Sequence, residues 1–383
     1  MAIVVKGKKK KEEGEKSVKE KLSSEDEIKE LETKISKTKY NKKTQFAIGQ
    51  MKAKLAKLKE KQASRSSGKG GHGFSVKKSG DGTVALLGFP SVGKSTLMNK
   101  LTGSKSSTGS YAFTTLDVIP SLLKHRGAQI QILDIPGIVK GAASGSGRGR
   151  EVLAALRSAD LILILLDVLH LNHLKVLKKE IFEAGIRENK IKPDVKLMKK
   201  DKGGVNIATT VKLTKINNDT IKIILKEFGY VNADIVIRDN IDSDDLIDVI
   251  NGNRVYTKSM IVINKADLID VKKLNNLKKE INASIAVSAE TGYHIDKLKD
   301  HLFDKLEFIK IYCKEKGKEA DMSEPLILLK GSTVKEMCIK LHKDFLKKFR
   351  FAKIWGPSSK FPGQTKMLEH KLMDNDIVEI STN

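Results

Sequence analysis

Short apolar runs, each followed by a longer stretch with helical spacing, dominate the middle of the chain. The runs consist mostly of Val, Ile, Leu and Ala, and they lie at Val84–Leu87, Ile130–Leu133, Leu161–Leu166, Met260–Ile263 and Ser284–Ser288. Runs of this length are typical of strands buried on both faces, and their alternation with helices is typical of parallel pairing. The pattern therefore predicts an α/β domain with a mostly parallel sheet and helices on both faces.

This alternation is interrupted after Leu166. The interrupting segment contains, in order, a helix at Asn172–Ala184, strands at Val195–Met198 and Val205–Thr209, a helix at Thr220–Phe228 and a strand at Ala233–Ile237. The polar sequence Asp201-Lys202-Gly203-Gly204 between the first two strands predicts a β-hairpin, and Asp219 is expected to cap the second helix. We predict that residues 188–240 form an inserted small α+β domain. A short helix at Ser243–Ile250 then leads back to the main sheet.

The N-terminal region predicts two amphipathic helices. The first begins at a capping box formed by Ser24 and Glu27, and Thr44 is expected to cap the second. The apolar stripe of the second helix consists of Phe46, Ala47, Met51, Leu55 and Leu58. We expect a basic arm and helical hairpin over residues 1–63, followed by a Gly-rich linker over residues 64–82.

The C-terminal region predicts a final small domain over residues 325–383, opened by Pro325. A helix at Ile295–Cys313 precedes it. The elements expected within it are strands at Ile327–Lys330, Phe351–Trp355 and Ile377–Ile380 and a helix at Val334–Phe345 capped by Thr333. Such a short unit suggests a compact, half-open sheet like that of ubiquitin. The main domain is then discontinuous, over residues 83–187 and 241–320.

The charge balance indicates an acidic partner. The 383 residues include 72 Lys and Arg against 47 Asp and Glu, a net charge of +25, and residues 1–80 hold 23 basic and 10 acidic residues, a net of +13. Nucleic acid is the usual partner of so basic a chain, and a lysine bias that serves solubility and thermal stability is the alternative. For the lysine-rich hairpin, contact with RNA phosphates and an ordinary solvated face remain equally good interpretations.

Cysteine and membrane signals are weak. Cys313 and Cys338 lack the spacing of a metal site and are expected to be reduced thiols. The longest apolar run ends at Asp167 and is far shorter than the roughly 20 residues of a membrane span, and Met1–Val5 is too short for a signal core. We therefore expect a soluble, cytoplasmic protein that does not contact a membrane.

A phosphate-binding loop follows the first apolar run. Gly88-Phe89-Pro90-Ser91-Val92-Gly93-Lys94-Ser95 matches G-x-x-x-x-G-K-[ST], and Thr96 continues into a helical pattern that ends at Gly103. Backbone N–H groups of such a loop surround a phosphate at a helix N-terminus. Lys94 is expected to reach the outer phosphates, and the Ser95 hydroxyl is expected to bind Mg²⁺.

A second motif selects the base. Asn264-Lys265-Ala266-Asp267 follows the run Met260–Ile263. A carboxylate at Asp267 can accept hydrogen bonds from N1–H and the 2-amino group of guanine, which adenine does not offer. Lys265 is expected to lie along the base, Asn264 to tie this loop to the phosphate loop, and Ser288-Ala289-Glu290 to offer a backbone N–H to the guanine O6. The sequence therefore predicts GTP and GDP as ligands and disfavours ATP.

Two further segments predict the magnesium site and the switch. Asp134-Ile135-Pro136-Gly137 follows the run Ile130–Leu133, so Asp134 is expected to hold Mg²⁺ through water and Gly137 to bring its N–H to the γ-phosphate. Of Thr114 and Thr115, we prefer Thr115 as the residue that completes the Mg²⁺ shell and senses the γ-phosphate. The expected metal ligands are thus Ser95, Thr115 and Asp134, and the expected catalytic groups are Lys94, Thr115 and Gly137.

The residue after Gly137 differs from the water-orienting Gln of Ras-type proteins. Ile138 cannot orient water, so the sequence predicts slow intrinsic hydrolysis that needs help from a partner, an ion or another residue. Gly141–Arg150 is rich in glycine and is expected to be a mobile switch. Either Arg148 or Arg150 could enter the site or contact RNA, and solvated loop charge is the favoured interpretation of each.

These motifs together resemble the Obg-like GTPases, and most closely the developmentally regulated GTP-binding family. The resemblance covers nearly the whole chain, and its most specific motifs are the phosphate loop through Thr96, Phe113-Thr114-Thr115-Leu116, Asp134 to Ile138 and Gly141-Ala142. It implies nucleotide contacts at Phe113, Thr114, Ile135, Pro136 and Ile138. It also implies an insertion resembling a domain of a small-subunit ribosomal protein and a C-terminal TGS domain with a β-grasp fold.

The resemblance further implies GTP hydrolysis linked to ribosomes and RNA. Some related GTPases use K⁺ held by a phosphate-loop asparagine; this chain has Ser91 there, and K⁺ stays a candidate cofactor. A stabilising partner protein, which eukaryotic relatives bind, is a candidate too, and we expect a monomer. Two hypotheses remain: a GTPase switch acting on ribosomes or rRNA in translation, and an RNA-binding or ribosome-binding adaptor in which GTP is mainly structural.

Overall fold

The computed structural model describes residues 25–66, 80–103, 120–135 and 147–382. The chain divides into two compact units, one formed by Met1–Gly73 with Lys190–Tyr256 and the other by Phe74–Asn189 with Thr257–Asn383. The predicted basic arm, Ser24 of the predicted capping box and most of the predicted linker lie outside the described residues.

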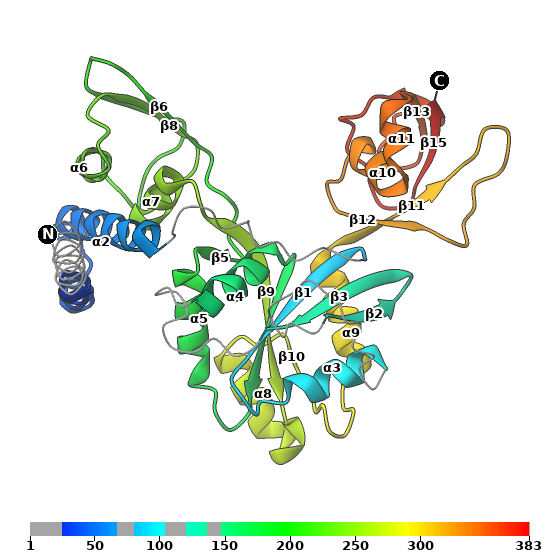
Figure 1. Ribbon diagram of the computed structural model, residues 1–383, viewed down its shortest axis with the longest axis horizontal. Coiled ribbons are helices and arrows are strands. Elements are labelled where there is room, and N and C mark those ends of the chain that lie inside the picture. The colour runs from blue at the N-terminus through cyan, green and yellow to red at the C-terminus, as the bar shows by residue number, and fades with distance from the viewer. Residues whose placement is uncertain (1–24, 67–79, 104–119, 136–146, 383) are drawn as a thin grey trace, which may run out of the picture. The chain divides into compact units, whose positions relative to one another are not determined.

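The larger unit contains a seven-stranded sheet with the order β10-β9-β4-β1-β3-β2, and β5 also pairs with β9 (Figure 1). Its strands are β1 (Gly82–Leu87), β2 (Pro120–His125), β3 (Ala128–Asp134), β4 (Leu161–Asp167), β5 (Ile186–Glu188), β9 (Val255–Asn264) and β10 (Ile285–Ala286). β1, β3, β4, β9 and β10 pair in parallel, whereas β2 is antiparallel to β3. The predicted mostly parallel sheet is confirmed.

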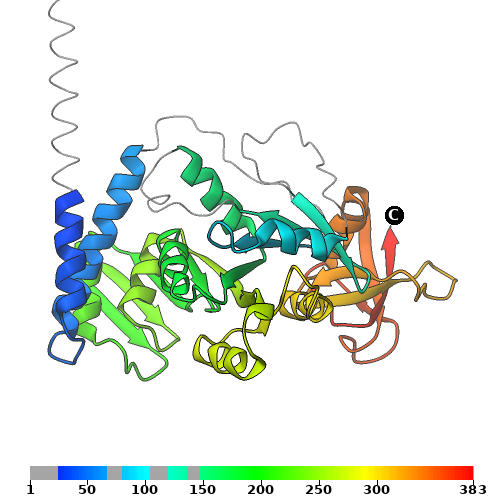
Figure 2. The same ribbon diagram turned by 90° about the horizontal axis from the view of Figure 1, so that it is seen from below.

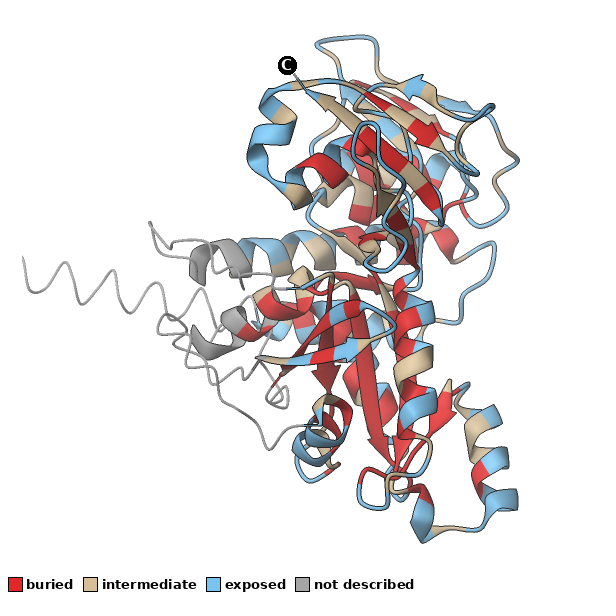
Figure 3. Cartoon of the chain, turned by 90° about the vertical axis from the view of Figure 1, so that its right-hand side faces the viewer, coloured by how far each residue is buried: buried red, intermediate tan, exposed pale blue. Residues whose placement is uncertain are grey.

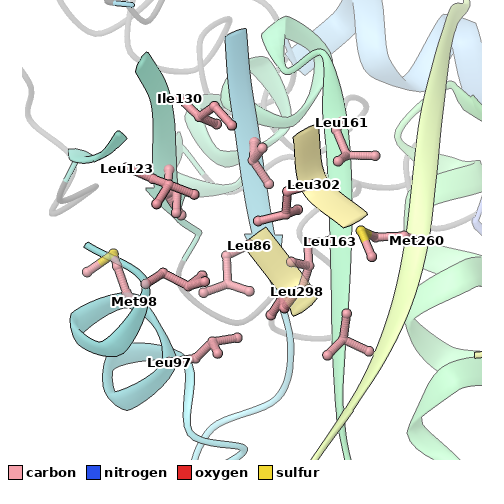
Figure 4. Close-up of a cluster of buried hydrophobic side chains, with 14 of the residues drawn as sticks. Leu86, Leu97, Met98, Leu123, Ile130, Leu161, Leu163, Met260, Leu298 and Leu302 are labelled. Carbon is pink, nitrogen blue, oxygen red and sulfur yellow. The ribbon is translucent and has the colours of Figure 1, made fainter. Parts of the chain in front are cut away.

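Helices cover both faces of this sheet because its central strands are apolar on both sides. Every residue of β1 and β4 is buried (red in Figure 3). Leu86 packs on the side of α3 (Lys94–Thr102) and α9 (Ile295–Leu306), in the cluster drawn in Figure 4. Leu87 packs on the opposite side, which carries α4 (Gly147–Ser158), α5 (His173–Glu183) and α8 (Val271–Glu280).

The edge strand β2 was not predicted from the sequence. It joins β3 through Arg126 and Gly127, both with positive φ, which is the geometry of a tight two-residue hairpin turn. Leu123 is buried in β2, but its neighbours Leu122 and Lys124 are exposed. One buried position in a short edge strand is too weak a pattern to distinguish it from a loop.

The smaller unit contains a three-stranded sheet, and here the predicted hairpin is wrong. β6 (Val195–Lys199) and β7 (Val205–Thr209) are not neighbours, because β8 (Ala233–Ile237) lies between them, antiparallel to β6 and parallel to β7. β8 has three fully buried positions, whereas β6 and β7 are at most partly buried. The most apolar strand takes the central place, where both its edges are paired.

Two helices of the smaller unit pack in one core with this sheet. They are α6 (Asn218–Glu227) and α7 (Ser243–Asn251). The side chain of Asn217 caps α6 by accepting a hydrogen bond from the Thr220 N–H, so the predicted cap at Asp219 is wrong by two residues. Leu246 of α7 is fully buried in this core, which places α7 with the insertion.

The helical hairpin belongs to the same unit. Figure 2 shows the helical residues 25–37 beside α2 (Gln45–Ser66), and the ion pairs Lys54–Glu27 and Lys59–Glu32 join the two helices. The predicted stripe on α2 is wrong at its start, because Phe46 is 44% exposed.

The buried face of α2 includes residues that were not part of the predicted stripe. Ile48 and Ala53 are buried, and a Cβ added at Gly49 would lie 2.5 Å from Cγ2 of Thr220. The helix therefore approaches α6 closely, and it does so through residues outside the predicted apolar stripe.

The C-terminal sheet has the order β12-β11-β15-β13-β14. Its elements are β11 (Phe308–Cys313), β12 (Leu326–Leu329), α10 (Val334–Leu341), α11 (Lys343–Lys347), β13 (Phe349–Trp355), β14 (Gln364–Lys366) and β15 (Asp376–Thr382). The predicted helix to Cys313 is wrong, because α9 ends at Leu306, Glu307 adopts φ 52°, and the chain continues as β11. The predicted helix to Phe345 breaks at His342, whereas its capping box of Thr333 and Glu336 is present. No helix in the described part of the chain is long and apolar enough to cross a membrane.

The packing of α2 leads to a stability prediction. Ile48→Ala should lower the free energy of unfolding by about 2–4 kcal/mol, because it leaves a cavity under the helix. Phe46→Ala, the matched control from the predicted stripe, should cost less than about 1 kcal/mol because that ring is largely exposed. Urea unfolding of the full chain followed by circular dichroism measures both. Equal losses would contradict the observed orientation of α2.

Candidate nucleotide-binding site

The phosphate loop connects β1 to α3, and its two glycines are sterically required. A Cβ on Gly88 would lie 2.8 Å from the carbonyl oxygen of Leu165. Gly93 has φ 92°, and a Cβ there would lie 2.5 Å from Nδ2 of Asn264. Because real Cβ atoms do not approach other atoms so closely, the two glycine positions of the motif follow from the close packing of the loop against Leu165 of β4 and Asn264 of β9.

Lys94 closes the loop on itself. Its Nζ donates hydrogen bonds to the carbonyl oxygens of Gly88, at 3.0 Å, and Phe89, at 3.2 Å. Burial lowers the pKa of the Lys94 ammonium, and the charge of Asp134 opposes this shift. Ser95 and Thr96 are exposed in the first turn of α3, and Pro90 and Ser91 are exposed in the loop. The loop thus presents an ammonium and a hydroxyl at a helix N-terminus, the arrangement that binds phosphate.

Asp134 ends β3 beside this loop. Its Oδ1 is buried and has no hydrogen-bond partner among the described residues. Burial raises the pKa of the carboxyl, and the Lys94 charge opposes this shift. A buried carboxylate oxygen without a partner is costly unless a cation or an ordered water satisfies it. The donor set of Asp134 and the Ser95 hydroxyl therefore fits Mg²⁺, a cation that prefers oxygen ligands and retains water.

Asn264 links the phosphate loop to the loops predicted to bind the base. Its side-chain Nδ2 donates a hydrogen bond to the carbonyl oxygen of Val92 at 2.8 Å, and its Oδ1 accepts one from the Ala289 N–H at 2.9 Å. Asn264 is 2% exposed. One buried amide therefore joins three loops that are far apart in the sequence. It also uses the Ala289 N–H, which the sequence analysis had considered for the guanine O6.

Asp167 is a site residue that the sequence analysis did not identify. It ends β4 in register with Asn264 of β9, and its Oδ2 accepts a hydrogen bond from Nζ of Lys265 at 2.7 Å. Burial opposes the ionisation of the Asp167 carboxyl, but hydrogen bonds from Lys265 and the Leu169 N–H hold its pKa below the usual value. Lys265 has φ 61°, a strained conformation for a lysine, and the ion pair helps to hold it there.

A ring-stacking contact with the phosphate loop was also not predicted from the sequence. The ring of Phe89 lies 4.1 Å from that of His173, at an interplanar angle of 24°. His173 in turn stacks on His170, whose Nδ1 lies 3.8 Å from Oδ2 of Asp167. His173 at the start of α5 therefore contacts the phosphate loop, and His170 just before that helix contacts Asp167, the partner of Lys265.

The remaining base-loop residues occupy the ends of β9 and β10. Asp267 is exposed in a short helical turn at Ala266–Leu268, and the Ala266 N–H donates to the carbonyl oxygen of Val287. Ser288 is buried, and its hydroxyl accepts a hydrogen bond from the Thr291 N–H, whereas Glu290 is exposed. Ile135 is buried, and its N–H donates to the carbonyl oxygen of Leu86.

Several predicted site residues lie outside the described residues. These are Phe113, Thr114, Thr115, Pro136, Gly137 and Ile138, together with the side chains of Arg148 and Arg150.

These contacts define the chain as a phosphate-loop GTPase. A family model described as a 50S ribosome-binding GTPase matches residues 83–200, and the model of the C-terminal region of that domain matches residues 202–308. A TGS-domain model matches residues 309–382, which confirms the predicted C-terminal fold and includes β11 in it.

Similar proteins match over nearly the whole chain. An uncharacterized GTP-binding protein of Methanocaldococcus jannaschii is 53% identical over 94% of this chain and 93% of its own length. Developmentally-regulated GTP-binding protein 1 of Xenopus laevis is 42% identical over 92% of this chain and 97% of its own length. The chain therefore belongs to the developmentally regulated GTP-binding protein family. Among solved structures, the Schizosaccharomyces pombe YchF GTPase is 15% identical over 80% of this chain and 99% of its own, with a TM-score of 0.43.

The ion pair at the base loop leads to a prediction on nucleotide release. Asp167→Asn should weaken GDP binding by about 5- to 20-fold, because a charged hydrogen bond that holds Lys265 is lost. Release of a fluorescent GDP analogue in a stopped-flow instrument measures this. The matched control is a double-mutant cycle with Lys265→Gln. The second substitution should add little to the first, and fully additive effects would contradict the role of the pair.

The pH dependence of this effect follows from the pKa of Asp167. A carboxyl whose pKa is lowered in the folded protein keeps its interaction above the ordinary titration range and loses it only as the pH falls through the lowered value. The difference in GDP affinity between wild type and Asp167→Asn should therefore be the same at about pH 6 and about pH 8.

Proposed function

We propose that this GTPase is a Mg²⁺-dependent switch whose nucleotide state controls its binding to ribosomes or RNA. The observation that carries the proposal is the Asn264 amide, which holds the phosphate loop at Val92 and the base-binding segment at Ala289 together. A single nucleotide can therefore be bound at its phosphates and at its base by loops that support one another. The family description of a ribosome-binding GTPase and the net charge of +25 support a ribosomal or RNA partner.

Each residue has a distinct proposed role. Lys94 leaves the loop carbonyls to bind the β- and γ-phosphates, which compensate the cost of its burial. Ser95, Asp134 and, in the GTP state, Thr115 would hold Mg²⁺. The metal would supply charge stabilisation for phosphoryl transfer. Asp267 accepts the two guanine donors, and Gly137 offers its N–H to the γ-phosphate.

Hydrolysis is proposed to be slow without a partner. Ile138 stands where Ras-type proteins place the water-orienting Gln, and an aliphatic side chain makes no hydrogen bond to water. The same residue favours the second candidate function, an adaptor that binds RNA or ribosomes and uses GTP mainly as a structural ligand. The two candidate functions differ in whether GTP hydrolysis is needed to release the protein from the ribosome or RNA.

Base selectivity leads to a prediction at Asp267. Asp267→Asn should lower GTP affinity by about 100-fold or more and raise affinity for xanthosine triphosphate, because the amide can donate to the xanthine O2. Displacement of a fluorescent GDP analogue by each nucleotide measures this. Asp270→Asn is the matched control, since Asp270 is an exposed carboxylate three residues away without a side-chain cap bond. Unchanged preference for guanine in Asp267→Asn would contradict the proposed base contact.

The switch itself is tested by sedimentation with ribosomes. Wild-type protein should pellet with ribosomes in the presence of a non-hydrolysable GTP analogue and should be released by GDP, and ribosomes should stimulate multiple-turnover phosphate release. Lys94→Ala should lose both the turnover and the dependence on nucleotide, because the ammonium that neutralises the outer phosphates is gone.

If Lys94→Ala loses turnover but still pellets and supports the cellular role, the adaptor is the correct function. If wild type does not pellet in either nucleotide state, the ribosomal proposal is wrong. Lys100→Ala is the control, because this exposed lysine lies in the last turn of the same helix.

A further inference from the structure

A small cleft is lined by residues of α8, β10 and the start of α9. Figure 1 shows these elements beside β10, the edge strand of the main sheet. Its floor is apolar and includes Leu274 and Ile285, which are buried, while its walls carry lysine, imidazole, amide and phenol groups. Its volume is about 170 Å³. Sites that enclose a whole drug-sized molecule are larger, about 300 Å³ and above, so this cleft has room for one ring-sized group.

An aromatic platform stands at one wall. Tyr293 and His294 stack with a centroid separation of 3.7 Å and an interplanar angle of 28°. Their places are set by a tight loop, in which the Ser288 N–H donates to the carbonyl oxygen of Tyr293 and His294 adopts φ 58°. Tyr293 is 45% exposed. An exposed, positioned phenol ring offers a face on which another planar ring can stack.

The imidazole of His294 positions a lysine beside this platform. Its Nδ1 lies 3.2 Å from the carbonyl oxygen of Ala286, and its Nε2 lies 3.1 Å from Nζ of Lys297. A neutral ring with its proton on Nδ1 satisfies both contacts, since it donates to the carbonyl and accepts from the ammonium. Lys297 is thereby held at the mouth of the cleft without an acidic partner in this contact.

The charge of the cleft is uniformly basic. Lys278 of α8 and Lys297 of α9 both line it, and no carboxylate does so among the described residues. The nearest acidic residue in the sequence, Asp296, already pairs with Lys299 at 2.8 Å. Two ammonium groups that flank an apolar, ring-sized floor complement a ligand that is planar and apolar at its centre and anionic on both sides.

We infer that this cleft binds a nucleotide of single-stranded RNA, with its base against Tyr293 and its flanking phosphates at Lys278 and Lys297. Aromatic stacking combined with phosphate contacts is the way proteins bind single strands, and Asn275 offers an amide to the base edge. An acidic peptide fits less well. β10 has only two residues, too few for an added strand, and the cleft is too small for the row of anchors that a helix inserts.

The inference rests on the proposed function, which it deepens by assigning an RNA contact to the GTPase unit. The RNA contact inferred at the cleft is separate from a contact through the lysines of the N-terminal region, which is a different hypothesis.

Fluorescence anisotropy of a labelled, unstructured 12-nucleotide RNA with the full-length protein tests the lysines. Lys278→Ala with Lys297→Ala should lower the slope of log affinity against log salt by roughly 1.4, because two phosphate contacts on a single strand are lost. The matched control is Lys272→Ala with Lys305→Ala, which removes the same charge from exposed lysines of α8 and α9 outside the cleft. Equal changes in the two double variants would overturn the inference.

The aromatic platform is tested at Tyr293. Tyr293→Ala should weaken RNA binding about 5- to 150-fold, the range for loss of one stacked base, and Tyr293→Phe should bind like wild type. Tyr293→Leu keeps an apolar side chain of similar bulk and should still bind RNA more weakly. A loss in this variant is therefore due to the missing aromatic ring and not to altered folding. Cross-linking of a 4-thiouridine RNA should map to residues 293–297. Binding by Tyr293→Ala equal to that of wild type, or cross-links only elsewhere, would overturn the inference.

Failure of the cleft and failure of the proposed function give different results. If wild type binds neither the RNA nor ribosomes, the proposed function is wrong. If wild type binds RNA and all cleft variants bind it equally well, only the inference about the cleft is wrong. Poly-glutamate that competes with RNA for wild type but not for the Lys278 and Lys297 double variant would instead show an acidic peptide as the occupant.

Discussion

The nucleotide site depends on one buried amide. Asn264 donates to the Val92 carbonyl and accepts from the Ala289 N–H, and both contacts are removed from water. A buried group that loses such a partner costs about 1–3 kcal/mol, so the three loops are stable only in the arrangement that satisfies the amide. The lack of a side chain at Gly93 is part of the same constraint, because a Cβ there would lie only 2.5 Å from the Asn264 side-chain nitrogen. The spacing within one motif is therefore set by a residue of another motif on a different strand.

The sheet explains why these loops meet. β1, β4 and β9 run in parallel, so their carboxyl ends lie at one edge and deliver the phosphate loop, Asp167 and Asn264 to the same place. Asp167 and Asn264 are paired in register, and this is why the carboxylate can reach Lys265 of the base loop. Burial of every residue in β1 and β4 holds that register, since helices pack on both faces and leave the strands no room to slip.

A feature could be predicted from the sequence when it depends on residues close together in the chain, and not when it depends on contacts between distant residues. The phosphate loop, the strand before it and the stop at Gly103 depend on neighbouring residues, and local patterns identified them. Asp167 and His173 act through contacts with Lys265 and Phe89, which lie far away in the chain, so no local spacing marked them. The order β6-β8-β7 was missed because the turn at residues 201–204 resembles a hairpin, whereas burial of β8 decided the pairing. The extension of the predicted helix through Cys313 failed because Phe308, Ile309 and Ile311 are apolar enough for either structure, and only the conformation of Glu307 and pairing with β12 and β15 select a strand.

The segment proposed to bind guanine and the cleft beside α8 share one loop. Ser288 accepts from the Thr291 N–H through its hydroxyl and donates its own N–H to the Tyr293 carbonyl, while the adjacent Ala289 N–H bonds to Asn264. A ligand that orders Tyr293 therefore acts on the same few hydrogen bonds that position the base-binding residues. Linkage requires such an effect to be reciprocal: if occupation of the cleft stabilises the loop for guanine, guanine nucleotide strengthens occupation of the cleft to the same extent. The short distance along the chain between Ala289 and Tyr293 means that no long-range rearrangement of the fold is needed for this coupling.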